Sequence, residues 1–329
     1  MKSKTITPCV KATPLHKGLI AWALSLVVAL LSNICPQSAR AEVQFIEEPA
    51  SCADLYTPVY QWRDSAVEPR AVVLCIHGFA SHGTAYRSLA RALAANGMLV
   101  YALDIRGFGK TYFNGRDRRV SYDTFADHDV SALAHALRSA HPGLKLYVCG
   151  ESMGASLALR LAAAEPHLVD GLILSAPSVK LKKHLRFVVR CFVGMIFHHG
   201  LINVSWQILH FGAADPAVGR QILQDPLTRT RFRASELIEV LRITRQTREL
   251  VGTIPARVPI LLLQASDDRT VSPRVVKILR QDLRTTDLTV VVSDHRGHVQ
   301  LEVNHPQADI VRVVSAWLDA HVVGSSEED

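Results

Sequence analysis

The sequence has few cysteines and no apolar run long enough to span a membrane. Six cysteines occur among 329 residues, and their positions show no spacing typical of a metal site. The apolar run from Leu19 to Leu31 is shorter than the roughly 20 residues that cross a bilayer. No internal repeat is present either. These absences disfavour a permanent membrane anchor, and we predict no metal.

Hydrophobic residues, by contrast, are plentiful. They make up 48% of the chain, so a chain of this length can bury a sizeable core. Disorder is expected only in the acidic tail at residues 324–329. The formal net charge of +7 would suit an anionic partner, but charge alone specifies neither fold nor activity. We predict no nucleic-acid partner.

The first 41 residues have the pattern of a secretory signal peptide. Four lysines precede the apolar run, and Ala39-Arg40-Ala41 has the small-x-small pattern of a cleavage site. The pattern predicts export, to a periplasm or to the outside of the cell, with a membrane-anchored chain as the alternative. Disulfides persist in such compartments. Of the cysteines that remain (52, 75, 149 and 191), Cys75 and Cys149 lie in apolar runs that favour buried free thiols, and a disulfide is the alternative.

Short apolar runs alternate with segments of helical periodicity along most of the chain. The run Ala71–Ile76 is uniformly apolar and ends at His77-Gly78, as a strand buried on both faces does. Strands are predicted at residues 71–76, 98–103, 144–149, 169–174, 260–264 and 288–292, and helices at 86–96, 127–140, 152–164 and 310–321. The polar segment before residue 71 carries no predicted element. This alternation predicts an α/β fold with a mostly parallel sheet and helices on both faces.

The alternation stops between residues 178 and 251, where the sequence is basic and helical in pattern and contains no strand-like run. We therefore predict one α/β core in two parts, residues 42–179 and 251–323, with a helical cap inserted at 180–250. Many apolar side chains lie between residues 187 and 197, with basic residues among and before them. The cap either packs down as a lid or exposes these side chains to an acyl chain or, peripherally, to a bilayer surface.

A Gly-x-Ser-x-Gly pentapeptide, Gly150-Glu-Ser-Met-Gly154, stands between a predicted strand and a predicted helix. The pentapeptide alone is weak evidence, because glycine and serine are common enough to produce it by chance. A strand, a sharp turn and a helix around it are what a nucleophile elbow requires. Glycines permit the tight turn, and the helix N-terminus favours developing negative charge. Ser152 is therefore the predicted nucleophile, with a structural serine as the alternative.

A serine nucleophile needs a histidine base held by a carboxylate, in the chain order Ser, Asp, His. The strand at 260–264 is followed by Asp267 and Asp268, and the strand at 288–292 by His295 and His298. Both pairs fall at the carboxyl edge of the sheet, where active sites of open α/β sheets lie. Gly297 frees the loop to aim its neighbour, which favours His298 over His295. The strand positions alone leave both aspartates open.

Two backbone N–H groups are predicted to hold the oxyanion of a tetrahedral intermediate. One belongs to Met153, directly after the nucleophile, and the other to Phe79, in the loop that follows His77-Gly78. We interpret His77 as a residue that shapes this loop.

With these pieces the chain resembles the monoacylglycerol lipase and lysophospholipase-like branch of the α/β-hydrolases, which is grouped with the serine aminopeptidases. The segments that carry the resemblance are Ile76-His-Gly-Phe79, Tyr101-Ala-Leu-Asp-Ile-Arg-Gly-Phe-Gly109, Gly150-Glu-Ser-Met-Gly154, Ser175-Ala-Pro177, Asp268-Arg-Thr-Val271 and Gly297-His298, with Glu302 four residues on. The stretch with Asp215-Pro216, Asp225-Pro226-Leu227 and Ala234 onward also resembles the cap of this family. In the family's pattern the acid stands three residues before a valine, which implies Asp268. Glu151 departs from the pattern, because the lipase branch usually carries histidine at that position.

Residues and resemblance together predict a serine hydrolase that cleaves carboxylic esters. Ser152, His298 and Asp268 would form the triad, and no cofactor is implied. The substrate implied is a small-molecule ester or lipid, such as a monoacylglycerol or a lysophospholipid. Alternatives are amide or peptide hydrolysis, acyl transfer on the same triad, or a non-catalytic lipid-binding protein. The complete set of nucleophile, base, acid and amide loop argues against the last.

Overall fold

The computed structural model describes residues 43–49, 57–115, 128–181, 201–212, 214–304, 306 and 308–323. The predicted signal peptide, Cys52, Cys191, the cap residues from 182 to 200 and the acidic tail lie outside these ranges. Within them, no helix has both the length and the apolar character that a bilayer crossing requires.

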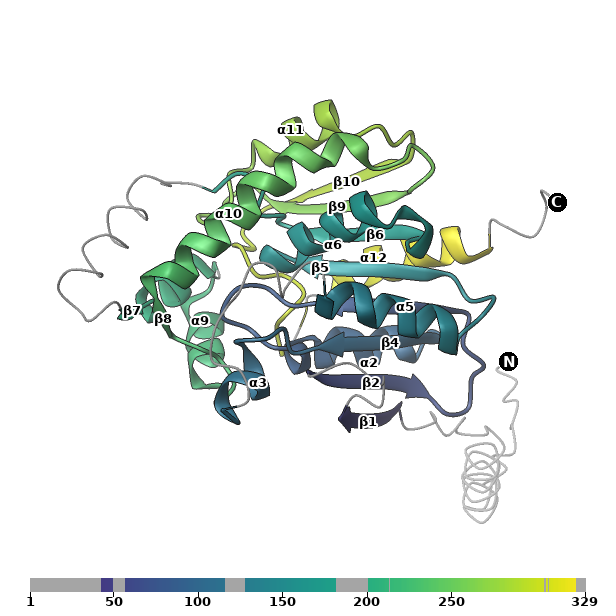
Figure 1. Cartoon of the computed structure of the whole chain (residues 1–329), viewed down its shortest axis with the longest axis horizontal. Helices are drawn as coiled ribbons and strands as arrows, with labels where there is room; N and C mark the ends of the chain where they lie inside the picture. The colour runs from purple at the N-terminus through teal and green to yellow at the C-terminus, as the bar shows by residue number, and fades with distance from the viewer. Residues whose placement is uncertain are drawn as a thin grey trace, which may run out of the picture. The chain divides into compact units, whose positions relative to one another are not determined.

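Eight strands of the described chain form one sheet (Figure 1). In spatial order they are β1 (Val43–Pro49), β2 (Pro58–Asp64), β4 (Met98–Leu103), β3 (Ala71–Ile76), β5 (Leu146–Glu151), β6 (Gly171–Ser175), β9 (Ile260–Ala265) and β10 (Leu288–Ser293). The strands from β4 to β10 run parallel, whereas β2 is antiparallel to both of its neighbours. The carboxyl ends of the parallel strands therefore meet at one edge.

Hydrophobic cores lie on both faces of this sheet. Alternate residues of β3 divide between them, with Leu74 and Ile76 in one core and Val73 and Cys75 in the other. Because both faces are covered, every residue of β3 and of β5 is buried, which explains the continuous apolar sequences at residues 71–76 and 146–149. Each leucine or isoleucine side chain buried in this way contributes about 1.5 to 3 kcal/mol.

Helices cover the two cores. One core includes residues of α2 (Arg87–Ala94) and α12 (Ala308–Val323), and the other includes residues of α5 (Val130–Ala140), α6 (Met153–Ala164) and α11 (Val275–Asp282). Buried residues recur at helical spacing in α2, as Leu89, Ala90 and Leu93 do. Short helical segments complete the core: η1 (Gly83–Tyr86), α3 (Gly109–Phe113) and η3 (Pro166–Leu168).

The predicted α/β fold is confirmed, and the predicted core strands and helices fall on observed ones. We predicted no strand before residue 71. This is wrong, because β1 and β2 lie there. In β2 the aromatic rings of Tyr60 and Trp62 are fully buried, while Gln61 is half-buried and Arg63 exposed. From Tyr60 to Arg63 this strand alternates buried aromatic and polar residues, and it therefore lacks the apolar run that marks the central strands.

The chain between β6 and β9 forms an insertion outside the large sheet. Its elements are β7 (Leu201–Asn203), α8 (Ser205–Gln207), η4 (Ile208–Gly212), α9 (Pro216–Gln224), β8 (Arg231–Arg233), α10 (Ala234–Leu250) and η5 (Val251–Thr253). We expected no strand here, and this is wrong, because β7 and β8 pair antiparallel in a small second sheet. Each has a single buried residue, Ile202 or Phe232, too little for a strand pattern. The long helix α10 packs against α6 of the core (Figure 1).

Candidate active site

Ser152 occupies a sharp turn between β5 and α6. Its backbone has φ 55° and ψ −112°, a strained conformation that costs about 1–3 kcal/mol and is typical of functional sites. The chain segments approach so closely that only glycine fits on either side. A Cβ on Gly154 would lie 1.9 Å from the Ile76 carbonyl oxygen, and one on Gly150 would lie 2.4 Å from Gly154. The turn places the serine hydroxyl at the carboxyl edge of the sheet, at the start of α6.

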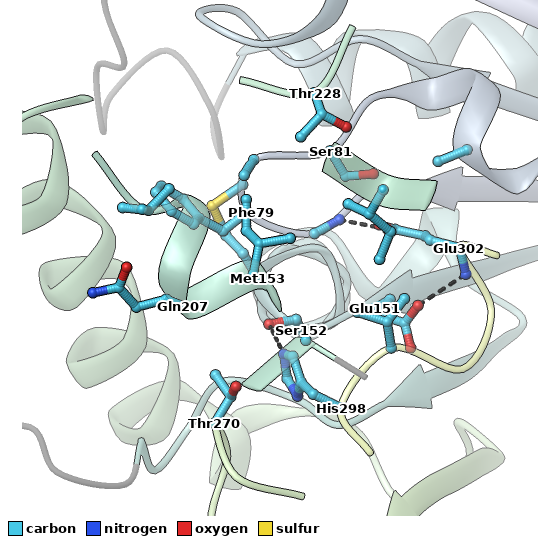
Figure 2. Close-up of a pocket in the computed structure, with 18 of the residues that line it drawn as sticks. Phe79, Ser81, Glu151, Ser152, Met153, Gln207, Thr228, Thr270, His298 and Glu302 are labelled. Atoms are coloured by element: carbon cyan, nitrogen blue, oxygen red, sulfur yellow. Dashed lines mark hydrogen bonds between the residues drawn. The ribbon is translucent and has the colours of Figure 1, made fainter. Parts of the chain in front are cut away.

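Ser152, His298 and Asp268 are linked by two hydrogen bonds. His298 Nε2 lies 2.8 Å from Ser152 Oγ, a contact shown in Figure 2, and His298 Nδ1 lies 2.9 Å from Asp268 Oδ2. A carboxylate can only accept, so Nδ1 carries the proton and Nε2 accepts from the serine hydroxyl. All three side chains are buried. This arrangement can take a proton from Ser152 and stabilise the imidazolium that results.

The two adjacent aspartates have different partners. Besides His298, the donors to Asp268 include Thr270 N at 2.7 Å, Val271 N at 2.9 Å and Gln264 Nε2 at 3.0 Å. Asp267 instead accepts the N–H groups of Arg296 and Gly297, at 3.2 and 3.1 Å. These belong to the segment after β10 that carries the histidine, residues 294–302, which we call the histidine loop. Asp268 therefore contacts the imidazole, and Asp267 shapes the loop that presents it.

Electrostatics drive the pKa values of His298 and Asp268 apart. Burial alone would raise the pKa of Asp268, but the charge of His298 and the hydrogen bonds outweigh burial and lower it. Burial would likewise lower the pKa of His298, but the charge and the hydrogen bond of Asp268 outweigh burial and raise it. His298 is therefore a stronger base than an ordinary histidine. His295 is an exposed residue of the same loop.

The predicted oxyanion amides belong to segments that border Ser152. Met153 is the first residue of α6, and the first N–H groups of a helix have no intrahelical acceptor. Phe79 follows Gly78 in the loop after β3, residues 77–81, which we call the oxyanion loop. A Cβ on Gly78 would lie 3.5 Å from the Ser152 Cβ, so this loop lies against the nucleophile. In Figure 2, Phe79 and Met153 lie on the side of Ser152 away from His298.

His77 holds the base of the oxyanion loop. Its Nδ1–H donates to the Gly78 carbonyl oxygen at 2.8 Å, and its Nε2 accepts the Ile105 N–H at 3.1 Å. Burial lowers the pKa of His77 to about 3, so the ring stays neutral and keeps this tautomer. These contacts support its interpretation as a loop-shaping residue.

Ser178 is a neighbour of the nucleophile that the sequence did not single out. Its Oγ lies 3.1 Å from Ser152 Oγ, and its N–H donates to the Ser152 carbonyl oxygen at 3.2 Å. The residue directly follows Ser175-Ala-Pro177, one of the segments that carry the family resemblance. Its position directly after this segment could have identified Ser178 from the sequence.

Glu151, the departure from the family pattern, anchors the histidine loop. Its buried carboxyl accepts hydrogen bonds from Ser175 Oγ at 2.7 Å and from the N–H groups of Gln300, Leu301 and Glu302 at 2.8, 3.0 and 2.9 Å. Burial raises the pKa of Glu151, while these hydrogen bonds lower it in part. The side chain just before the nucleophile thus fixes the turn that directly follows His298.

A cavity of about 440 Å³ opens beside Ser152, between the sheet edge and the insertion. Its lining is mostly apolar and includes Phe79 and Met153 from the core and Val204, Ile208, Leu237 and Val240 from the insertion. Ser81, Thr228 and Glu302 lie together on one side of it in Figure 2. This volume is typical of small-molecule sites. The cavity could hold an apolar chain with a polar group at one end.

Other candidate sites lie apart from this cavity. Cys75 and Cys149 are buried free thiols on β3 and β5. Within the described ranges, one group of side chains, His135, Glu165 and His167, brings three metal-ligating atoms within 4.8 Å of one another. None of the three lines the cavity, and His135 Nε2 already pairs with a Glu165 carboxylate oxygen at 2.6 Å.

The sheet order, the strained serine turn after β5 and a histidine after the last strand define the class. They are the features of an α/β-hydrolase with a nucleophile elbow. The family model for serine aminopeptidases, S33, matches residues 67–303. The chain belongs to this family.

Known proteins narrow the class further. A putative monoglyceride lipase of Schizosaccharomyces pombe is 27% identical over 281 residues, which cover 82% of this chain and 72% of the relative. The monoglyceride lipase of Homo sapiens is 27% identical over 266 residues, which cover 78% and 84%. A crystal structure of a soluble variant of monoglyceride lipase from Saccharomyces cerevisiae, in complex with a substrate analog, matches with a TM-score of 0.69 at 18% identity and covers 85% of this chain and 96% of that one. The predicted resemblance is confirmed, and the chain is a monoglyceride lipase-like serine ester hydrolase.

Proposed function

We propose that the chain hydrolyses lipid-like carboxylic esters, monoacylglycerols or lysophospholipids, through an acyl-enzyme on Ser152. One observation carries this proposal: the hydrogen bonds from Asp268 through His298 to Ser152, at 2.9 and 2.8 Å, end at an apolar cavity. The monoglyceride lipases among the relatives support the choice of a lipid substrate.

Acylation is the first half of the proposed reaction. His298 Nε2 takes the proton of Ser152 as its Oγ attacks the acyl carbonyl carbon, and Asp268 stabilises the imidazolium. The N–H groups of Phe79 and Met153 hold the negative charge that develops on the carbonyl oxygen. One such donor typically contributes about 10²- to 10³-fold in kcat. The imidazolium then protonates the leaving alcohol, and the C–O bond to it breaks.

Hydrolysis of the acyl-enzyme completes the cycle. His298 takes a proton from a water molecule, and the water oxygen attacks the acyl carbon. When the second tetrahedral intermediate collapses, the proton returns to Ser152 Oγ and the carboxylic acid leaves. Every proton transfer in this scheme uses His298, so the proposal includes no cofactor.

A fluorophosphonate probe tests the nucleophile. We expect it to label the wild-type protein and not Ser152→Ala. Ser178→Ala is the matched control, because this neighbouring serine hydroxyl lies only 3.1 Å away and we expect labelling to persist without it. A wild-type protein that does not label would contradict the proposed mechanism.

A substrate panel tests the ester. Esters of increasing acyl length, monoacylglycerols, lysophospholipids and aminoacyl amides are compared by kcat/KM. Preference for the long-chain lipids supports the proposal, and turnover of short esters alone contradicts the lipid assignment. Turnover of the amides would favour the second candidate, peptide hydrolysis, which the name of the family suggests.

We also propose that the chain is exported and cleaved after Ala41. The basic, apolar and small-residue regions of the first 41 residues support this. The mass of the protein recovered from its native host tests it. We expect a chain that begins at Glu42, and a chain that begins at Met1 would contradict cleavage.

The proposal further treats residues 180–250 as the cap over the core formed by residues 42–179 and 251–323. It is supported by the pairing of β7 with β8 alone, outside the large sheet. A peripheral contact of the cap with bilayers is tested by co-sedimentation with anionic phospholipid vesicles. Sedimentation that high salt abolishes supports an electrostatic contact, and a protein that stays in the supernatant at low salt contradicts it.

A further inference from the structure

Glu302 is a buried carboxyl that the mechanism above does not use. Its side chain lines the cavity and is only 7% exposed. Its Oε1 accepts the Gly78 N–H at 2.5 Å. Gly78 belongs to the oxyanion loop. Glu302, which is the last residue of the histidine loop, therefore holds the oxyanion loop through a main-chain N–H group.

The position of Glu302 is in turn fixed from the nucleophile elbow. Its own N–H donates to Glu151 Oε2 at 2.9 Å, and Glu151 immediately precedes Ser152. Gly78 immediately precedes Phe79, whose N–H is the proposed oxyanion donor. Two hydrogen bonds, from Gly78 N–H to Glu302 and from Glu302 N–H to Glu151, thus connect the oxyanion loop to the nucleophile (Figure 2).

The two carboxyls have different surroundings. Glu151 accepts three backbone N–H groups and one hydroxyl, partners that favour its ionised form. Burial and then the charge of Glu151 raise the pKa of Glu302 well above its ordinary value. Two neighbouring buried carboxyls do not both ionise readily. Glu302 is therefore the neutral member of the pair, and its carbonyl oxygen serves as the acceptor for Gly78.

We propose that Glu302 is a positioning residue for oxyanion stabilisation: by holding the Gly78 N–H it directs the next amide, Phe79 N–H, at the substrate carbonyl oxygen. This rests on the proposed function, in which that amide binds the oxyanion. Glu302 touches no reacting atom. Without Glu302, the buried Gly78 N–H would have no hydrogen-bond acceptor. Because a buried unsatisfied donor is costly, we expect the oxyanion loop to change conformation so that this N–H reaches another acceptor. A displacement of about 1 Å at a reacting group can cost about 100-fold in rate.

Two substitutions of Glu302 with side chains of nearly equal size separate the effect of its hydrogen-bond acceptor from the effect of its volume. Glu302→Leu removes the acceptor, and we expect kcat to fall about 10- to 100-fold with little change in KM. Glu302→Gln keeps a neutral carbonyl acceptor, and we expect it to recover kcat to within about threefold of wild type. A loss that appears mainly in KM, or a glutamine variant as impaired as the leucine variant, would overturn the proposal.

A transition-state mimic gives a readout that a merely structural role would not move. A trifluoromethyl ketone substrate analogue forms a tetrahedral adduct with a serine nucleophile and places an oxyanion at the site. We expect Glu302→Leu to weaken its inhibition by the same factor as kcat, while the inhibition constant of an uncharged, non-reactive product analogue stays unchanged. Equal weakening of both inhibitors would overturn the proposal.

Failure of this inference can be told from failure of the proposed function. A wild-type protein that is not labelled by fluorophosphonate overturns both. A labelled wild type with an unimpaired Glu302→Leu variant overturns the positioning role alone. If the leucine variant does not fold, the NMR chemical shift of the Gly78 amide proton, measured in the wild type and in Glu302→Gln, tests the proposal instead. We expect the low-field shift of a strong hydrogen bond in both, and an ordinary shift in the wild type would overturn the proposal.

Discussion

The cavity has two walls, and different kinds of contact hold them. On the sheet side, buried carboxylates bind backbone N–H groups. Asp268 accepts two from the turn that follows it, and Glu151 accepts three from the histidine loop. On the side of the insertion, which we propose to be the cap, a side chain makes the contacts that we consider. Arg229 pairs with Glu236 at 2.7 Å and donates to the Gly107 carbonyl oxygen at 2.8 Å.

The cap contact is also built on aromatic rings. The Arg229 guanidinium lies 4.1 Å from the centre of the Tyr112 ring and 4.2 Å from that of Phe232, and the Phe232 ring lies 4.3 Å from that of Phe79. A carboxylate bound to successive amides fixes the path of the main chain, and with it the geometry of the reacting atoms. A contact between two side chains, by contrast, can be changed by substitution without a change in the path of the main chain. We therefore expect the sheet wall to govern kcat and the cap wall to govern stability and substrate choice.

The largest expected effect is on the sheet wall. Asp268→Asn leaves the size of the side chain unchanged but removes the charge that stabilises the His298 imidazolium and the acceptor that fixes its tautomer. We expect kcat to fall by about 10⁴-fold with KM little changed. Asp267→Asn is the matched control, because Asp267 binds only backbone N–H groups of the histidine loop, and its loss should stay below about tenfold. Equal losses in steady-state kinetics would contradict the assignment of Asp268 as the acid.

The next effect is on the stability of the cap wall. Arg229→Met removes the arginine partner of the buried Glu236 carboxylate, and breaking such a pair costs about 3–5 kcal/mol of unfolding free energy. Arg242→Met is the control, because that arginine side chain is 54% exposed and pairs with Glu239 on the surface, where an ion pair contributes less than about 1 kcal/mol. Urea unfolding measures both. If the two variants lose equal stability, Arg229 does not hold the cap.

A smaller effect is expected on substrate choice. Val240 lies on α10 and lines the cavity, so Val240→Phe takes up room that an acyl chain would use. We expect the ratio of kcat/KM for a long-chain over a short-chain ester to fall about tenfold, since one methylene in such a pocket is worth about 1–3 kcal/mol. Ile238→Phe, on the same helix but 43% exposed, should leave the ratio unchanged. An unchanged ratio in Val240→Phe would place the acyl chain elsewhere.

The two walls also differ in how far the sequence predicted them. The central strands are apolar because both faces are covered, and site residues follow directly after them, so strand positions led to Ser152, the aspartate pair and the histidine pair, from which Gly297 selected His298. Spacing within the family pattern then favoured Asp268, the residue that contacts His298. Glycines at 150 and 154 were predicted from the motif, and the close approach of Gly154 to β3 gives the physical reason.

The rest depended on contacts that local patterns do not encode. Glu302 meets Gly78 across 224 positions of sequence, and Glu151 meets the histidine loop across about 150. No periodicity within a strand or helix records such pairs. In the cap, β7 and β8 have three residues each and are recognisable only because they pair with each other. The resemblance to the family indicated a cap in this part of the chain, but its two strands had no sequence signal of their own.

The smallest expected effect is a shift of the pH profile. It tests whether the charge of Glu151, on the sheet wall, affects the pKa of the catalytic histidine. An imidazolium cannot accept the Ser152 proton, so kcat/KM falls as the pH drops through the pKa of His298. That pKa is lowered by burial but raised overall, by Asp268 first and then by the charge of Glu151. The acid limb should therefore lie above the pKa of an ordinary histidine. Glu151→Gln removes one of the two charges that favour the imidazolium, so we expect the limb to move to lower pH.

The position of the limb separates charge from structure. Glu151→Gln also loses one acceptor for the histidine loop, which lowers the whole profile, but only the lost charge moves the limb along the pH axis. The measurement is kcat/KM for an uncharged short-chain ester at constant ionic strength, with Glu239→Gln in the cap as the control whose limb should not move. A limb that stays in place in Glu151→Gln would mean that the carboxyl is neutral in the free enzyme. In that case Glu151 would affect catalysis only through the hydrogen bonds that fix the histidine loop. The sheet wall and the cap wall would then differ in how rigidly they hold the main chain, and not in how their charges affect His298.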